Sequence, residues 1–250
     1  FSKDRNLFQQ YSEFMRVYLA LGHMTECEPD NSGYFLSHHP VHNESSTTTK
    51  LRVVFNASMK TDNNKSINDN LLVGPNLQQD LFSILIRFRI HKVVVCADLK
   101  KMYRQILLHP DHRKYQKIFW RNDSGEDIKV YQLNTVTYGF ASSSYLATRC
   151  VHELANLEMQ NFPEAATIIL RDMYVDDLIY GSSNIVDAAQ LLNDIKQILI
   201  KAGFELHKIS SNYSCDFGFD EELQQQEQIS LDKQNTNKTL GVFWDNNKTK

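Results

Sequence analysis

The chain has 250 residues, of which 42% are hydrophobic and 23% charged, with only 9 Gly and 5 Pro. This composition excludes collagen-like and low-complexity classes, and no apolar run approaches the roughly 20 residues that span a membrane. The net charge of −3 gives no general case for nucleic-acid binding. The chain begins at Phe1 with neither Met nor a basic-then-apolar leader, so we expect a fragment of a longer intracellular chain.

Helical spacing of apolar residues predicts four helices, and glycines follow two of them at the expected stop positions. They cover residues 7–22, 80–89, 142–158 and 184–202. In the third, Leu146, Cys150, Leu154 and Leu157 share a face, and Ser142 or Ser143 can cap the helix. In the first, Tyr11, Phe14 and Tyr18 are expected to belong to the core.

Short β-prone runs separate these helices and predict strands over residues 51–55, 93–97, 118–120, 130–133, 174–180, 204–209 and 239–244. The run 93–97 is apolar throughout, which is typical of a central buried strand. Helices mixed with antiparallel strand pairs indicate an α+β fold.

The cysteines and histidines give little support for a transition-metal site. The four Cys lie far apart without a Cys-x-x-Cys pair, so we expect neither a zinc site nor a disulfide framework, and a reducing compartment fits best. His38 and His39 are neighbours, whose side chains diverge on a strand, so we expect structural packing.

Charge is unevenly distributed along the chain. Residues 86–121 hold ten Lys and Arg against two Asp, whereas residues 214–232 hold six acids and neither Lys nor Arg. The acidic stretch is typical of a solvated linker. The basic stretch is either an ordinary solvated face or a contact surface for phosphates.

Two acidic segments suggest phosphoryl-transfer chemistry. Asp176 and Asp177 lie between β-prone runs, where a hairpin bend can direct both side chains to one site, although Asp is also a common turn residue. Asp98 ends the buried run 93–97, where an unpaired carboxylate is costly; a helix cap or a lysine pair is the alternative. Carboxylates brought together repel, and Mg²⁺ ions that remove this repulsion also serve nucleotidyl transfer.

Seven segments form an ordered set of motifs along the chain: residues 34–41, 51–58, 97–106, 133–142, 174–177, 203–208 and 240–244. They resemble, in the same order, the motifs of reverse transcriptases of Bel/Pao-type LTR retrotransposons, and the resemblance covers nearly the whole chain. Tyr174 to Asp177 resembles the double-Asp box of that family. An ordered set of this kind is far more specific than a lone double-Asp box.

The resemblance implies a role for each matching residue. Asp98, Asp176 and Asp177 hold two Mg²⁺ ions, which Mn²⁺ can replace, and Lys208 is the candidate proton donor to pyrophosphate. The nucleotide-binding residues are Arg52, Tyr103, Tyr138 and Gly139, with Tyr103 excluding a 2′-hydroxyl. Primer and template contacts are assigned to Tyr174, Leu240, Gly241 and Trp244.

Three positions depart from the family pattern. Asn56 stands where Asp is usual, Ser144 replaces a usual Pro, and Lys100 occupies a place where an acid is common. None of the three removes an implied metal ligand.

The implied protein is an RNA- and DNA-directed DNA polymerase, part of a retrotransposon Pol polyprotein in a cytoplasmic retroelement particle. Its partners are an RNA or DNA template, a primer and dNTPs, without a membrane. A right-hand fold is implied: fingers over 1–91 and 111–138, palm over 92–110 and 139–212, then an acidic linker, a primer-grip-like strand and the start of an otherwise missing thumb over 213–250. The rivals are a catalytically inactive nucleic-acid-binding remnant and, less well matched, a two-metal nuclease.

Overall fold

The computed structural model describes residues 4–30, 32–42, 51–123 and 125–213, together with the backbone of 236–239 and 242–245. The fold is α+β, and every paired strand in its four sheets is antiparallel. The chain forms two compact units, each from two segments: residues 1–75 with 103–147, and 76–102 with 148–250.

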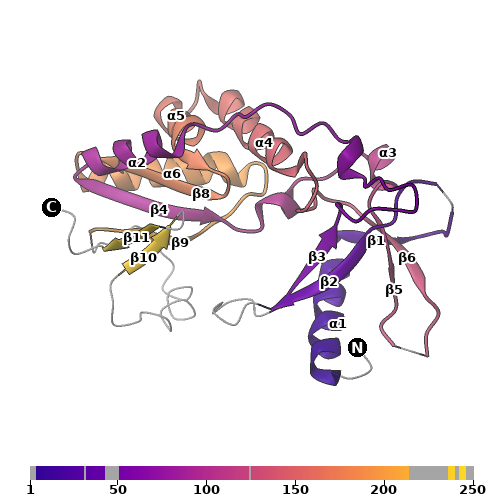
Figure 1. Ribbon diagram of the computed structural model, residues 1–250. Helices are drawn as coiled ribbons and strands as arrows, with labels where there is room; N and C mark the ends of the chain where they lie inside the picture. The colour runs from indigo at the N-terminus through magenta and orange to yellow at the C-terminus, as the bar shows by residue number, and fades with distance from the viewer. Residues whose placement is uncertain are drawn as a thin grey trace. The chain divides into compact units, whose positions relative to one another are not determined.

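The hydrophobic core of unit 1 includes the aromatic face of helix α1 (Arg5–Ala20). A three-stranded sheet has the order β1 (Met24–Cys27), β6 (Lys129–Leu133), β5 (Lys117–Trp120), and a second sheet pairs β2 (Ser37–His42) with β3 (Leu51–Asn56) (Figure 1). Tyr11 and Tyr18 of α1 pack with residues of these strands in one hydrophobic core. The predicted core role of these aromatics is confirmed. Short helices η1 (Asn68–Asn70), η2 (Met102–Gln105) and α3 (Pro110–Arg113) complete the described elements of this part of the chain.

Unit 2 contains a four-stranded sheet in the order β7-β8-β4-β9. Its strands are β7 (Met173–Tyr174), β8 (Asp177–Ser182), β4 (Val93–Leu99) and β9 (Leu206–Ser211). β4 is central, as its continuous apolar run predicts, and its first five residues are all buried. Val94 and Cys96 pack with Ile84 and Phe88 of helix α2 (Leu81–Ile90).

Two further helices belong to unit 2: α5 (Pro163–Asp172) and α6 (Ile185–Ile200). Tyr180 of β8 donates a hydrogen bond to the Ala188 carbonyl of α6, which ties this helix to the sheet. Strands β10 (Thr236–Thr239) and β11 (Val242–Asp245) form a separate antiparallel pair (Figure 1).

Helix α4 (Ser143–Glu158) begins one residue after the predicted start and ends where predicted, but its predicted apolar face is not its most buried one. Ala147, Val151 and Ala155 are buried, whereas Cys150 is exposed and Leu157 is 70% exposed. Small side chains let a helix approach its neighbours closely, so the face with the largest apolar residues is not the one that packs. No helix among the described residues has the length and apolar character needed to cross a membrane.

Candidate active site at the end of strands β4, β8 and β9

A two-residue turn between β7 and β8 places the neighbouring aspartates. Tyr174 pairs with Asp177 across the hairpin, so Val175 and Asp176 form the turn. Val175 adopts a φ of 56°, a left-handed conformation that is unfavourable for a β-branched residue. Strain of this kind persists only where the surroundings impose it, and it is frequent at functional sites.

The register of the sheet brings Asp98 to the same end. Asp98 of β4 lies directly opposite Asp177 of β8, and the Leu99 amide donates a 2.7 Å hydrogen bond to the Asp176 carbonyl. Burial raises the pKa of Asp98, and the negative charge of Asp176 raises it further. The hydrogen bond from Leu99 therefore joins the segments of Asp98 and Asp176, which are 78 positions apart in the sequence.

Two basic side chains of β9 oppose this rise. The Lys208 ammonium lies 3.8 Å from Asp98 Oδ2, and His207 Nδ1 lies 3.4 Å from Asp98 Oδ1; both groups lower the pKa of Asp98. The Asp98 side chain is 27% exposed, so this end of the sheet is accessible to solvent.

A bulge in β9 determines which of these residues faces Asp98. Cys96 pairs with Ser210 but Asp98 pairs with His207, so β9 carries one extra residue between the two pairs. Lys208, in the bulge, has a φ of 51°. In a regular ladder Lys208 would have been the partner of Asp98, and the alternation along β9 gives no sign of this shift.

The departure at Lys100 has a local partner. Its ammonium lies 3.0 Å from a Glu205 carboxylate oxygen, and its amide donates to the Glu205 carbonyl. A basic residue at this place is therefore paired with an acid from the neighbouring segment.

The candidate nucleotide residues Arg52, Tyr103, Tyr138 and Gly139 all belong to unit 1. Arg52 is exposed on β3 and forms no ion pair with any carboxylate in the part of the chain that the structure describes. Tyr103 is half-buried in η2, and its hydroxyl lies 3.3 Å from the Ser144 hydroxyl.

Tyr138 and Gly139 both make structural contacts within unit 1. The Tyr138 hydroxyl donates to the Val53 carbonyl, and its ring packs near Phe55. Gly139 has a φ of 101°, and a Cβ atom there would lie 2.7 Å from the Phe55 carbonyl oxygen. Glycine is therefore required by the approach of β3, in addition to any contact with a nucleotide.

Not all of the candidate primer and template residues can be placed. Tyr174 is half-buried and packs against the core formed by α2 and β4. Leu240 and Gly241 lie outside the described residues, as does the acidic stretch 214–232; the backbone of Trp244 pairs with Asn237.

The basic stretch 86–121 divides between the two units. Several of its residues have carboxylate partners: Arg87 with Asp172, Lys100 with Glu205 and Lys117 with Asp30. Arg104 is held within about 6 Å of the rings of Phe14, Tyr18 and Tyr138. The exposed basic side chains of the stretch that can still meet phosphates include Arg89, Lys92, Lys114 and Arg121.

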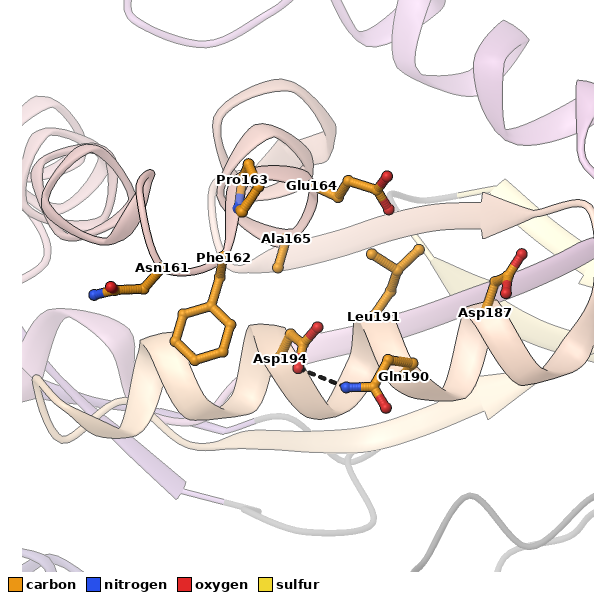
Figure 2. A pocket seen from close by; sticks show the side chains of 9 residues that line it. All are labelled: Asn161, Phe162, Pro163, Glu164, Ala165, Asp187, Gln190, Leu191 and Asp194. Atoms are coloured by element: carbon orange, nitrogen blue, oxygen red, sulfur yellow. Dashed lines mark hydrogen bonds between the residues drawn. The ribbon is translucent and has the colours of Figure 1, made fainter.

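A hollow of about 290 Å³ between α5 and α6 is unsuited to a nucleotide (Figure 2). Glu164, Asp187 and Asp194 line it together with Phe162, and its lining contains neither Lys nor Arg. Three carboxylates repel a polyphosphate, so the carboxylate end of the sheet is the better candidate site.

The donor set at this end can be tested against a magnesium ion. Among the described residues, no three His, Cys, Asp or Glu side chains are arranged to hold one ion between them. Mg²⁺, however, is commonly bound through one or two carboxylates, water and substrate phosphates. Asp98 and Asp176 would supply two such carboxylates, and a cation would favour the ionised form of Asp98, whose pKa is raised by burial and further by the charge of Asp176.

Comparison with known protein families identifies the family of the chain. A family model described as reverse transcriptase (RNA-dependent DNA polymerase) matches residues 45–242, a span that contains all three aspartates. Comparison with curated proteins returns no match. Because the family model matches well over half of the chain, the chain belongs to the reverse transcriptase (RNA-dependent DNA polymerase) family, whose members are nucleotidyltransferases.

Proposed function

We propose that the chain is a DNA polymerase that adds dNTPs to a primer 3′-end on an RNA or DNA template, with its reaction centre at the ends of β4, β8 and β9. The observation that carries this proposal is the strand register that places Asp98 opposite Asp177 and joins the Leu99 amide to the Asp176 carbonyl, in a member of the reverse transcriptase family. We further propose that the element is a Bel/Pao-type retrotransposon and that this chain is part of its Pol polyprotein, acting in a cytoplasmic particle.

In this proposal Asp98 and Asp176 hold two Mg²⁺ ions, with Asp177 in the same cluster. Bound divalent ions would activate the attacking 3′-oxygen and stabilise the charge of the leaving pyrophosphate. Lys208, which now faces the Asp98 carboxylate at 3.8 Å, is a mobile ammonium suited to donate a proton to pyrophosphate.

The remaining residues bind and select the substrate. Arg52 carries an exposed guanidinium, which suits the bidentate recognition of triphosphate oxygens. Tyr103 screens the sugar of the incoming nucleotide. We propose a palm over 92–110 and 139–212, most of which belongs to unit 2, and fingers over 1–91 and 111–138, most of which belong to unit 1.

Primer extension on an RNA template with Mg²⁺ tests the proposal. Asp176→Asn is expected to lower turnover at least about 10³-fold, equivalent to about 4 kcal/mol of barrier. Asp194→Asn is the matched control, since Asp194 lies in the hollow between α5 and α6 and is expected to leave turnover unchanged. An Asp176→Asn variant within tenfold of the wild type would contradict the assignment.

The rival function, a nucleic-acid-binding remnant, gives a different result. It predicts retention of labelled primer–template on a filter while dNTP incorporation stays at background. Cleavage of labelled duplex without dNTPs would instead indicate a nuclease.

A further inference from the structure

His207 is the residue of β9 whose ring makes the most direct contact with Asp98. The two residues lie opposite each other across the β4–β9 ladder, because the bulge at Lys208 shifts the register by one residue. Directly opposed residues in an antiparallel pair have neighbouring side chains. The bulge therefore presents an imidazole to Asp98 where a regular strand would present Lys208.

One ring nitrogen of His207 lies close to both the backbone carbonyl and the carboxylate of Asp98. His207 Nδ1 lies 3.0 Å from the Asp98 carbonyl oxygen and 3.4 Å from its carboxylate Oδ1. A carbonyl oxygen can only accept a hydrogen bond, so Nδ1 carries a hydrogen and donates it. The two side chains are 22% and 27% exposed, so the contact is partly shielded from water.

Lys208 cannot provide the same restraint. Its ammonium is 3.8 Å from Asp98 Oδ2, beyond hydrogen-bond length, and its side chain is 53% exposed. A lysine also has four rotatable bonds, whereas the imidazole is rigid beyond χ2. The geometry of Asp98 therefore depends on His207 more than on Lys208.

We propose that His207 is a positioning residue that holds the Asp98 backbone and carboxylate in the geometry needed to bind a divalent cation. This inference rests on the proposed function, because it concerns the same carboxylate. Small displacements of a reacting or coordinating group can cost as much as about 100-fold in rate.

Three substitutions separate positioning from simple stability. His207→Asn keeps an N–H near the position of Nδ1, His207→Gln moves the N–H one bond further out, and His207→Leu removes it. We expect His207→Leu to lower kcat about tenfold and to raise the half-saturating Mg²⁺ concentration, with KM for dNTP within twofold. We expect His207→Asn to restore both quantities to within threefold of the wild type and His207→Gln not to restore them.

Binding of Mn²⁺ to the protein without nucleotide, followed by electron paramagnetic resonance, gives a readout that needs no turnover. His207→Leu is expected to weaken Mn²⁺ binding several-fold and His207→Asn to restore it, with Asp98→Asn as the reference for loss of the ligand. Wild-type Mn²⁺ binding in His207→Leu, or equal rescue by Gln and Asn, would overturn the inference.

The two proposals fail in different ways. If the wild type extends primers but His207→Leu matches it in kcat and Mn²⁺ binding, only the positioning role is wrong. If the wild type incorporates no dNTP, the polymerase proposal fails, and the Mn²⁺ measurement alone still decides the role of His207.

Discussion

At the scale of single residues, Val175 has a strained backbone conformation in the turn that carries Asp176. Its φ of 56° places a β-branched side chain in a backbone region that costs L-residues about 1–2 kcal/mol. The turn must nevertheless deliver Asp176 to a position from which its charge acts on Asp98. The β-prone residues on either side predict the hairpin, but the sequence Tyr174 to Asp177 does not predict that the φ angle of Val175 is positive.

Val175→Gly should stabilise the protein by up to about 1 kcal/mol, because glycine tolerates a positive φ, although its own unfolded-state entropy offsets part of the gain. Chemical denaturation measures this difference. Val186→Gly is the control: Val186 is 72% exposed in the first turn of α6, where glycine should be destabilising. A loss of stability in both variants would contradict the strain at Val175.

Tyr103 provides a second prediction at this scale. If its ring screens the sugar, Tyr103→Ala should raise the incorporation of ribonucleotides relative to deoxyribonucleotides by at least about tenfold, or 1.4 kcal/mol of discrimination. Tyr103→Phe keeps the ring and should retain most of the selectivity, since it removes only the hydroxyl that meets Ser144. Competitive incorporation assays compare the three proteins, and unchanged selectivity in Tyr103→Ala would remove this residue from the nucleotide site.

Among the elements, α1, β2 and β5 are joined by one half-buried histidine, His38. The Tyr11 hydroxyl bonds to His38 Nδ1, and His38 Nε2 lies 2.9 Å from the Phe119 carbonyl oxygen. If Nε2 donates to that carbonyl, Nδ1 accepts from Tyr11, so the neutral ring satisfies both partners. The predicted packing role of His38 is confirmed.

Burial lowers the pKa of His38 below its usual value of 6.5. The unfolded chain then binds a proton more readily than the folded one, so this contribution to stability is complete above pH 6.5 and falls as the pH drops toward the folded-state pKa. We expect the denaturation midpoint of unit 1 to decrease between pH 7 and pH 5. Fluorescence of Trp120, whose ring lies 6.1 Å from His38, can follow this unit in a Trp244→Phe background. The decrease should be smaller in His38→Gln, and an equal decrease in both proteins would rule out His38 as its source.

The helices and strands differ in how well the sequence predicts them. Long periodic segments such as α1 and α6 are predictable because their apolar stripes are clear, and β4 is predictable from its unbroken apolar run. Helix α5 is not among the predicted helices, although Pro163 marks its start. At 10 residues it offers a short window, and it runs directly into β7.

Some features of the site cannot be predicted from sequence patterns, because they depend on pairing between segments that are distant in the chain. The motifs identify Asp98, Asp176 and Lys208 one by one, but the shift at the β9 bulge depends on how β9 meets β4. The partnership of Lys100 with Glu205 likewise joins residues 105 positions apart. Such contacts are properties of register, which no local periodicity encodes.

For the molecule as a whole, the net charge of −3 hides a division between paired and unpaired basic residues. Arg87 and Lys117 are committed to Asp172 and Asp30, with the Lys117 side chain only 3% exposed. Lys114 and Arg121 are exposed. Exposed cations are the ones that can displace counterions from a nucleic-acid backbone.

We therefore expect Lys114→Ala or Arg121→Ala to reduce the slope of log affinity against log salt by about 1 for each phosphate that is no longer neutralised. Lys100→Ala is the control, because its ammonium is already paired with Glu205. Fluorescence anisotropy of a labelled primer–template over a salt series gives these slopes. An equal reduction of the slope in Lys100→Ala would show that pairing does not determine which cations bind nucleic acid.

The division of each unit into two chain segments has a consequence for biosynthesis. Residues 76–102, which include strand β4, are synthesised before residues 103–147, which complete unit 1. Strand β4 can form its native hydrogen bonds only after β8 and β9 have been synthesised. The exposed edges of β4 are thus without their native neighbours while more than seventy further residues are translated. Nascent chains stalled in this interval should be especially prone to aggregate or to recruit chaperones, since unpaired apolar strands readily associate.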